Sequence, residues 1–280
     1  MKFDFQGRAA LLRGLDFWRR GSAALPLVMS LLVAFGAMAQ TTNILSDAEI
    51  QGRQLAQKLL EQQPATNSTF TGVLNIRYAK GSHLEIPVKC EAIIYPTMWH
   101  DVGYPTNWLN IYQAFPTNGL NEELSVTHND NLPNRYFHHA GSGIGRDPEV
   151  EDQHVIFPGK PGEQFAHSDF SIGDLGLEFL HWPGQKILRG DTARGRLCKV
   201  LESTNPNPST NGYSRVLCWI DNEALGIVEA KAYDAQGKLL KEFYPKDIKK
   251  VDGQWQVGSM EIDNVQTGSR TRLEFDLQSK

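Results

Sequence analysis

The sequence predicts an α+β protein built on one large, curved antiparallel sheet, with one helix near the N-terminus and another near residues 171–180. Three observations predict this class. The 280 residues are 40% hydrophobic and 21% charged, which is typical of a globular protein with a core. Apolar and polar residues alternate in many segments, as they do in strands with one buried side. Turn residues separate the C-terminal segments at short intervals, which favours antiparallel pairing.

The first 39 residues have the three parts of a secretory signal peptide. A stretch with four arginines precedes an apolar run over residues 23–35, and the small-residue site Ala37-Met38-Ala39 follows. We expect cleavage between Ala39 and Gln40 and export to the periplasm, by the Sec or the twin-arginine route. The alternative is a membrane anchor, but a proline interrupts the apolar run, which is shorter than a membrane span needs.

Removal of this segment would leave a more acidic protein. The segment holds five of the 28 basic and two of the 32 acidic residues, so the formal charge changes from −4 to −7. An acidic surface is a poor match for nucleic acid, so we expect no nucleic-acid partner. No later apolar run reaches the length of a membrane span. We expect residues 40–280 to form a single domain and a monomer.

A helix is expected at the start of the exported chain, over residues 47–62. Ser46 can cap its first turn, and Leu55 and Leu59 recur at the spacing of one helix face. Pro64 ends the pattern.

The second helix is expected near residues 171–180. Ser171 followed by Asp174 resembles a capping box with Asp in place of Glu. A short helix from Ile172 would then have Leu175 and Phe179 on one side.

Most of the remaining chain is predicted to be strand. The alternation or the flanking turn residues indicate strands at 70–79, 85–95, 108–115, 122–127, 135–139, 195–202, 213–221, 228–233, 239–244, 248–251, 255–257 and 271–277. The C-terminal segments form an antiparallel meander of five or six strands, with a strong hairpin signal at Asp252-Gly253. Residues 140–164 are rich in Gly, Pro, Asp and Glu and are expected to form a long loop or a flap.

Three cysteines remain after export, and an oxidising compartment allows one disulfide. Cys90 is expected on a buried strand face as a small core residue. If the hairpin around residue 208 pairs symmetrically, partner numbers sum to 416 and Cys198 faces Cys218. We therefore predict a Cys198–Cys218 disulfide, with two buried thiols in contact as the alternative.

The sequence contains no recognisable catalytic site, and we expect neither an enzyme nor a cofactor. Six histidines lie between residues 128 and 181 without the ligand spacing of a metal site, namely His128, His138, His139, His154, His167 and His181. The glycine-rich segment 141–145 lacks both the spacing of a phosphate-binding loop and that of a nucleophile elbow. Metal binding and hydrolysis stay open as a weaker class of function.

A series of motifs in the second half carries a resemblance to a known family. They are Ser168-Asp169-Phe170-Ser171, Cys218-Trp219-Ile220-Asp221, Lys231-x-Tyr233-Asp234-x-x-Gly237-Lys238, Asp252-Gly253-x-Trp255, Met260-x-x-x-Asn264 and Thr267-Gly268-x-x-Thr271. In this order the motifs resemble the outer membrane lipoprotein-sorting protein family, in its LolA-like branch. The resemblance is clearest over residues 168–275.

The resemblance implies an incomplete antiparallel β-barrel, covered by helices, with an apolar cavity. It also implies a non-enzymatic periplasmic carrier or binder of lipoprotein acyl chains or another apolar ligand. Partners would be the lipoprotein or lipid cargo and envelope membrane proteins. The alternative is a structural or interaction module of the envelope, with a filled core and no ligand.

Seven apolar residues are our candidates for the cavity lining. Five come from the early strands and two from the second helix: Leu74, Ile76, Ile86, Val88, Ile94, Leu175 and Phe179. The alternative for each of them, which residue type alone favours, is a plain core residue without a ligand contact.

Overall fold

A computed structural model describes residues 45–94, 108–129, 132–141, 157–210, 212–251 and 254–277. The expected signal peptide, residues 1–39, lies outside the described residues, as do His154 and the turn at Asp252-Gly253. Export and the single domain over residues 40–280 therefore stay predictions.

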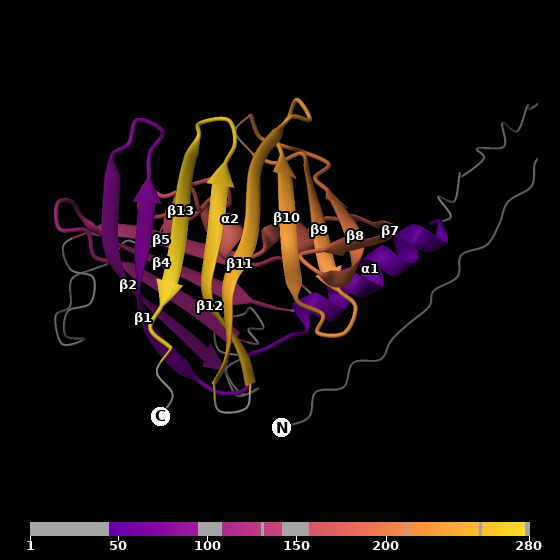
Figure 1. Ribbon diagram of the computed structural model, residues 1–280, viewed down its shortest axis with the longest axis horizontal. Coiled ribbons are helices and arrows are strands. Elements are labelled where there is room, and N and C mark those ends of the chain that lie inside the picture. The colour runs from indigo at the N-terminus through magenta and orange to yellow at the C-terminus, as the bar shows by residue number, and fades with distance from the viewer. Residues whose placement is uncertain are drawn as a thin grey trace, which may run out of the picture. The chain divides into compact units, whose positions relative to one another are not determined.

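The described strands form one continuous antiparallel sheet (Figure 1). Its thirteen strands follow the order β6-β5-β4-β3-β2-β1-β13-β12-β11-β10-β9-β8-β7. Strand β1 pairs with β2 on one side and with β13 on the other, for example Leu74 with Ile86 and with Leu273. This double pairing joins the N-terminal strands to the C-terminal meander, so the two halves of the chain share one sheet.

Most of the elements begin and end within a few residues of the predicted bounds. The helical segments are α1 (Asp47–Leu60), α2 (Ile172–Leu175) and the single 3₁₀ turn η2 (Glu178–His181). The strands are β1 (Ser68–Arg77), β2 (His83–Ile94), β3 (Trp108–Ala114), β4 (Asn121–His128), β5 (Arg135–Gly141), β6 (Phe157–Pro158), β7 (Gly184–Ala193), β8 (Arg196–Thr204), β9 (Arg215–Asp221), β10 (Ile227–Tyr233), β11 (Leu239–Val251), β12 (Gln254–Asn264) and β13 (Ser269–Phe275). The predicted first helix and most predicted strands are confirmed.

Helix α1 begins with a complete capping box. The Ser46 hydroxyl accepts from the amide of Glu49, and the Glu49 carboxylate accepts from the amide of Ser46 at 2.8 Å. Gly52 allows the helix to approach strand β7 closely, because a Cβ at this position would lie 2.5 Å from the amide nitrogen of Lys186. The apolar face of α1 packs with η2 and the inner face of β8–β10 in a core cluster that includes Leu55, Leu59 and Leu201.

The second helical segment is shorter than predicted. The expected capping box forms between Ser171 and Asp174, but α2 ends at Leu175. Leu177 has a left-handed backbone conformation (φ 50°), which interrupts the helix before η2 begins. Phe170, Ile172 and Leu175 complete a second core cluster on the inner face of β1–β4, β12 and β13. The expectation of a helix-covered barrel is thus met only in part, since the sheet is open and two short helices cover part of its inner face.

Four strands differ from the sequence prediction. Strand β6 lies in the segment that was expected to be a loop, and β12 continues to Asn264 although only residues 255–257 were predicted as strand. Strand β7 is absent from the prediction because most of its side chains are exposed and its apolar and polar residue types do not alternate along the sequence. The predicted strands at 239–244 and 248–251 are one strand, β11, which continues through register shifts next to Pro245 and Asp247.

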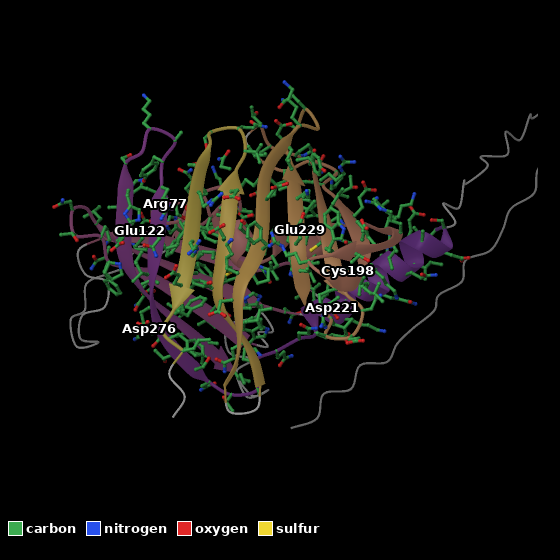
Figure 2. The ribbon with its side chains drawn as sticks, in the orientation of Figure 1. Arg77, Glu122, Cys198, Asp221, Glu229 and Asp276 are labelled. Carbon is green, nitrogen blue, oxygen red and sulfur yellow. The ribbon has the colours of Figure 1, made fainter. Side chains whose placement is uncertain are left out.

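The predicted Cys198–Cys218 disulfide is wrong, and all three cysteines are free thiols buried in the core. Strand β8 pairs with β9 so that Leu201 lies opposite Cys218. Cys198 lies opposite Asp221, and both residues are labelled in Figure 2. The register is three residues away from the symmetric hairpin, and an odd shift moves a side chain to the other face of a sheet. Cys198 therefore packs beside Val200 on the outer face, while Cys218 belongs to the inner-face cluster.

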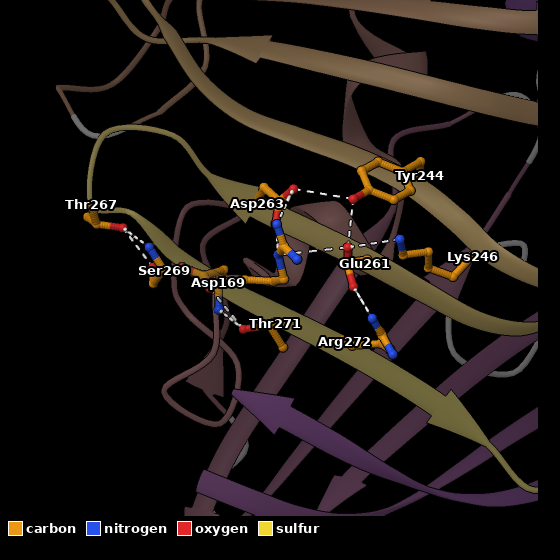
Figure 3. A network of polar contacts seen from close by, with 10 residues as sticks. Asp169, Tyr244, Lys246, Glu261, Asp263, Thr267, Ser269, Thr271 and Arg272 are labelled. Carbon is orange, nitrogen blue, oxygen red and sulfur yellow. Dashed lines mark hydrogen bonds and ion pairs between the residues drawn. The ribbon is translucent and has the colours of Figure 1, made fainter. Parts of the chain in front are cut away.

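The outer face of β11–β13 holds a buried carboxylate with several partners (Figure 3). Glu261 is fully buried, accepts from the Tyr244 hydroxyl at 2.6 Å, and lies 2.7 Å from the Arg272 guanidinium. Burial alone would raise the pKa of Glu261, but the hydrogen bonds of Tyr244 and Arg272 lower it below its usual value. The network ties the three strands together at the centre of the sheet.

Candidate ligand cavity

A cavity of about 390 Å³ lies on the inner side of the sheet. Strands β3 and β4 form one wall, and β11 and β12 form another. The α2–η2 segment, the end of α1 and the turn between β9 and β10 complete the lining. The lining residues are Leu59, Leu60, Gln62, Trp108, Asn110, Tyr112, His128, Phe170, Asp174, Leu175, Gly176, Leu177, Leu180, Leu225, Gly226, Ile227, Phe243, Pro245, Val257 and Met260. Most of these side chains are apolar or aromatic, and the volume lies within the range of small-molecule sites, about 300–1,000 Å³.

Two lining leucines have a backbone conformation that bulky residues rarely adopt. Leu177 has φ 50° between α2 and η2, and Leu225 has φ 53° in the turn that precedes β10. The side-chain amide of Gln62, just beyond α1, donates to the carbonyl of Leu225 at 3.2 Å and holds this turn against the helix end. Left-handed conformations of this kind cost about 1–3 kcal/mol each and persist where surrounding contacts fix them. Here both strained positions bring a leucine to the cavity wall.

The polar part of the wall comes from β3 and β4. Trp108 stacks on His128 across the two strands, with ring centroids 3.8 Å apart. Asn110 lies two residues further along β3 and donates from Nδ2 to the Tyr112 hydroxyl at 3.0 Å. The Asn110 Oδ1 and His128 Nε2 atoms are buried without a hydrogen-bond partner among the described residues.

A chain of hydrogen bonds runs outward from this wall through Asn134. Its amide donates to the carbonyl of Gly176 at 2.6 Å, and its oxygen lies 3.1 Å from Nε2 of His181. Burial lowers the pKa of His128 to about 3 and that of His181 to about 4, so both rings are neutral near pH 7. The Tyr136 hydroxyl continues the chain to Glu178, whose pKa is raised by burial.

A second hollow of about 590 Å³ lies outside α2 and is more polar. Its central contacts are those of Asp174, which accepts from the Tyr213 hydroxyl at 2.8 Å and lies 3.2 Å from the Lys241 ammonium. Because Asp174, Tyr213 and Lys241 are already paired with one another, these three groups are not free to bind a ligand. Its walls combine polar residues with apolar ones such as Phe179 and Trp182, so it is less uniformly apolar than the inner cavity.

The predicted lining residues are distributed between core and cavity. Leu175 lines the inner cavity, and Phe179 lines the outer hollow. Four others belong to the well-packed core cluster under α2 and have at most 4% of their surface exposed: Leu74, Ile76, Ile86 and Val88. Ile94 is half-buried at the end of β2, opposite Trp108. The cavity begins where this packed core ends.

The residues that the sequence analysis missed include Asn110 and His128. An asparagine between Trp108 and Tyr112, on the inner face of an aromatic strand, is the pattern that could have indicated them. The turn at Leu225 and strand β12 also line the cavity, but no sequence pattern could indicate this. These segments are far from β3 in the sequence and approach it only in the folded sheet.

The remaining histidines are separated or bound by protein groups. His138 contacts Glu122 at 3.1 Å and Glu163 at 3.5 Å, while His167 is an exposed residue in the otherwise buried segment before α2. Among the described residues, no three His, Cys, Asp or Glu side chains are grouped so that they could hold a metal ion.

With this geometry established, comparison with known proteins places the fold. A family model described as an uncharacterized protein matches residues 147–278. No curated protein shows significant sequence similarity to the chain. A DUF1329 family protein from Desulfovibrio piger superposes with a TM-score of 0.63 at 18% identity, over 82% of this chain and 92% of that one.

Two further solved structures share the fold. An outer membrane lipoprotein-sorting protein domain from Vibrio parahaemolyticus has a TM-score of 0.62 at 17% identity, with 82% of this chain and 92% of that one covered. A LolA superfamily protein from Nitrosomonas europaea has a TM-score of 0.55 at 13% identity, with 83% and 93% covered. The chain has the LolA-type fold. The resemblance seen in the sequence motifs is therefore confirmed, and at these identities it is a likeness of fold.

In this LolA-type fold, the cavity lies on the inner face of the sheet. The core cluster under α2 and the cluster under α1 fill the two ends of that face. The cavity lies between them and takes lining from both ends, including Leu175 and Leu59. A ligand in this position would contact both halves of the sheet.

Proposed function

We propose that the protein is a non-enzymatic carrier or binder of acyl chains or another apolar ligand in the periplasm. The observation that carries the proposal is the apolar inner cavity of about 390 Å³, on a LolA-type sheet. Burial of a methylene group gains about 0.8 kcal/mol, so a hydrocarbon chain gains several kcal/mol from such a cavity. A soluble carrier of acylated cargo needs a concave apolar surface of this kind.

Lipoprotein or lipid cargo is the partner that this proposal favours, with envelope membrane proteins as donors or acceptors. Two observations support it: the similar Vibrio domain is described as a lipoprotein-sorting protein, and the inner cavity of this chain has an apolar lining. The expected signal peptide at residues 1–39 supports a periplasmic location. None of the described helices is long and apolar enough to cross a membrane.

The alternative is an envelope interaction module that binds no apolar ligand. The tightly packed cluster around Leu74, Ile76 and Leu124 favours it, because these residues fill their part of the interior completely. The two proposals differ in what happens to the cavity. A carrier takes up an apolar ligand there, and an interaction module keeps it empty.

Ligand uptake can be tested with a fluorescent naphthylamine probe, whose emission rises in apolar surroundings, and with native mass spectrometry of protein purified without detergent. Met260→Trp fills the cavity from strand β12, and Val265→Trp adds the same side chain at an exposed turn. We expect about tenfold weaker probe binding for Met260→Trp, which corresponds to roughly two excluded methylene groups. Unchanged affinity for Val265→Trp is the control. Absence of probe and acyl-chain binding by the wild type would leave the interaction module as the better proposal.

A further inference from the structure

The orientation of the Asn110 side chain is fixed by its neighbour. The Tyr112 hydroxyl donates its one proton toward the carbonyl of Leu175, at 3.5 Å, so it can only accept from Asn110. The amide nitrogen of Asn110 therefore faces Tyr112, at 3.0 Å. The atom left without a partner is Oδ1, a hydrogen-bond acceptor.

The second atom without a partner in the described part of the chain is Nε2 of His128. Burial lowers the pKa of the His128 ring, so near pH 7 the ring is neutral and carries its one proton on either Nδ1 or Nε2. A ligand that donates a hydrogen bond to Nε2 selects the tautomer with the proton on Nδ1, in which Nε2 is an acceptor.

The two unpartnered atoms belong to neighbours on one wall. His128 pairs with Trp108 and Asn110 pairs with Val126, so His128 and Asn110 are diagonal neighbours on the inner face of β3 and β4. Both side chains line the cavity. A buried polar group without a hydrogen bond costs about 1–3 kcal/mol, and a ligand in the cavity is in position to supply the missing donors.

Charged ligands fit this wall poorly. Asn110 and neutral His128 carry no countercharge. Asp174, the one carboxylate among the described residues that line the cavity, is already held by Lys241 and Tyr213. Burial of an unpaired charge costs far more than burial of a neutral group that finds a hydrogen bond. The polar end of the ligand is therefore neutral.

We propose that the cavity selects an uncharged amphipathic ligand, whose apolar chain contacts the leucine and aromatic walls and whose polar end donates N–H or O–H hydrogen bonds to Asn110 Oδ1 and His128 Nε2. This inference rests on the proposed function, because it specifies the ligand of the same cavity. Primary and secondary amides and alcohols on an alkyl chain have the required chemistry. Esters, ethers and tertiary amides lack the donors.

Two ligands that differ in their donors test the proposal. Decanamide carries two N–H donors, and N,N-dimethyldecanamide carries none while keeping the chain and the carbonyl. We expect the wild-type protein to bind decanamide about tenfold more tightly in displacement of the naphthylamine probe, as one or two net hydrogen bonds predict. In Asn110→Leu/His128→Phe the preference falls to about onefold, while the phenyl ring keeps the stack on Trp108.

Gln256→Leu is the matched control. Gln256 Oε1 is also a buried acceptor without a partner among the described residues, but Gln256 does not line the cavity. This variant should keep the preference for decanamide. Equal affinity of the wild type for the two amides, or an unchanged preference in the double variant, would overturn the inference and leave the carrier in place. Failure of both amides and the probe to bind would overturn the carrier itself. If the double variant does not fold, the wild-type ratio of the two affinities still decides.

Discussion

The Tyr244 hydroxyl donates a 2.6 Å hydrogen bond to Glu261, a carboxylate that has no exposed surface in the middle of a thirteen-stranded sheet. The opposite oxygen of Glu261 lies 2.7 Å from the Arg272 guanidinium on strand β13. The Lys246 ammonium and the Arg270 guanidinium lie 3.6 and 3.8 Å away. Loss of the carboxylate would leave these cations without their shared partner.

Glu261→Gln should therefore destabilise the protein by about 3 kcal/mol, since removal of one member of a buried ion pair typically costs about 3–5 kcal/mol and the cations here keep partial contact with water. Urea denaturation measures the free energy of unfolding. Glu274→Gln is the control, because Glu274 also contacts Arg272, at 3.2 Å, but is exposed. Its cost should stay below about 1 kcal/mol. Equal costs for both variants would show that burial of Glu261 does not matter.

Gly52 is expected to resist substitution, although it lies inside helix α1. Alanine normally stabilises a helix by about 1 kcal/mol relative to glycine. In this helix the added Cβ would lie 2.5–2.7 Å from backbone atoms of Gln185 and Lys186, which cannot rotate away. Gly52→Ala should lower the free energy of unfolding by about 1–3 kcal/mol. Gln54→Ala, on an exposed position of the same helix, should leave it unchanged or raise it. A stabilised Gly52→Ala variant would contradict the close contact of α1 with β7.

The free thiols give a direct chemical test of the strand register. Cys198 and Cys218 lie on opposite faces of the sheet, and burial raises the pKa of both thiols. We expect three reactive thiols per chain in denaturant without a reducing agent, and almost none under native conditions. A count of one in denaturant would mean a disulfide, and hence a register different from that of β8 and β9.

Strands β8 and β9 also show how much of the structure could be predicted from the sequence. Alternation located β8 and β9 within a few residues, because inner and outer side chains differ in polarity. It could not set their register, which depends on the long turn from 205 to 214 and on the neighbouring strands.

The cavity shows a second limit. Apolar residues on the inner face were correctly expected to be buried, as Leu74 and Ile86 are. Whether such a residue packs against α2 or faces open space is decided by the end of that helix at Leu175 and by the left-handed turn at Leu177. The helix end and the left-handed turn cannot be predicted from hydrophobic periodicity. A leucine adopts a positive φ only where tertiary contacts impose it.

The contact of His138 with two carboxylates predicts how stability depends on pH. The hydrogen bond with Glu122 raises the pKa of His138 above its ordinary value of 6.5, against the effect of burial, and Glu163 adds to the shift. Burial raises the pKa of Glu122, but His138 and the Ala166 amide outweigh it and lower that pKa below 4.5. A raised histidine pKa stabilises the fold fully below about pH 6.5, and this stabilisation is lost as pH rises through the folded-state value. A lowered carboxylate pKa stabilises above about pH 4.5, and that part is lost as pH falls through its folded-state value.

The His138 contact should therefore contribute most between about pH 4.5 and 6.5. We expect His138→Gln to lower the melting temperature more at about pH 5.5 than at about pH 8.5, because only the protonated ring gains from both carboxylates. His83→Gln is the control, since His83 is exposed and lies 3.9 Å from Glu85. It should show little difference between the two pH values. A melting-temperature difference for His138→Gln that is equal at both pH values would mean that the ring acts through packing and not through its charge.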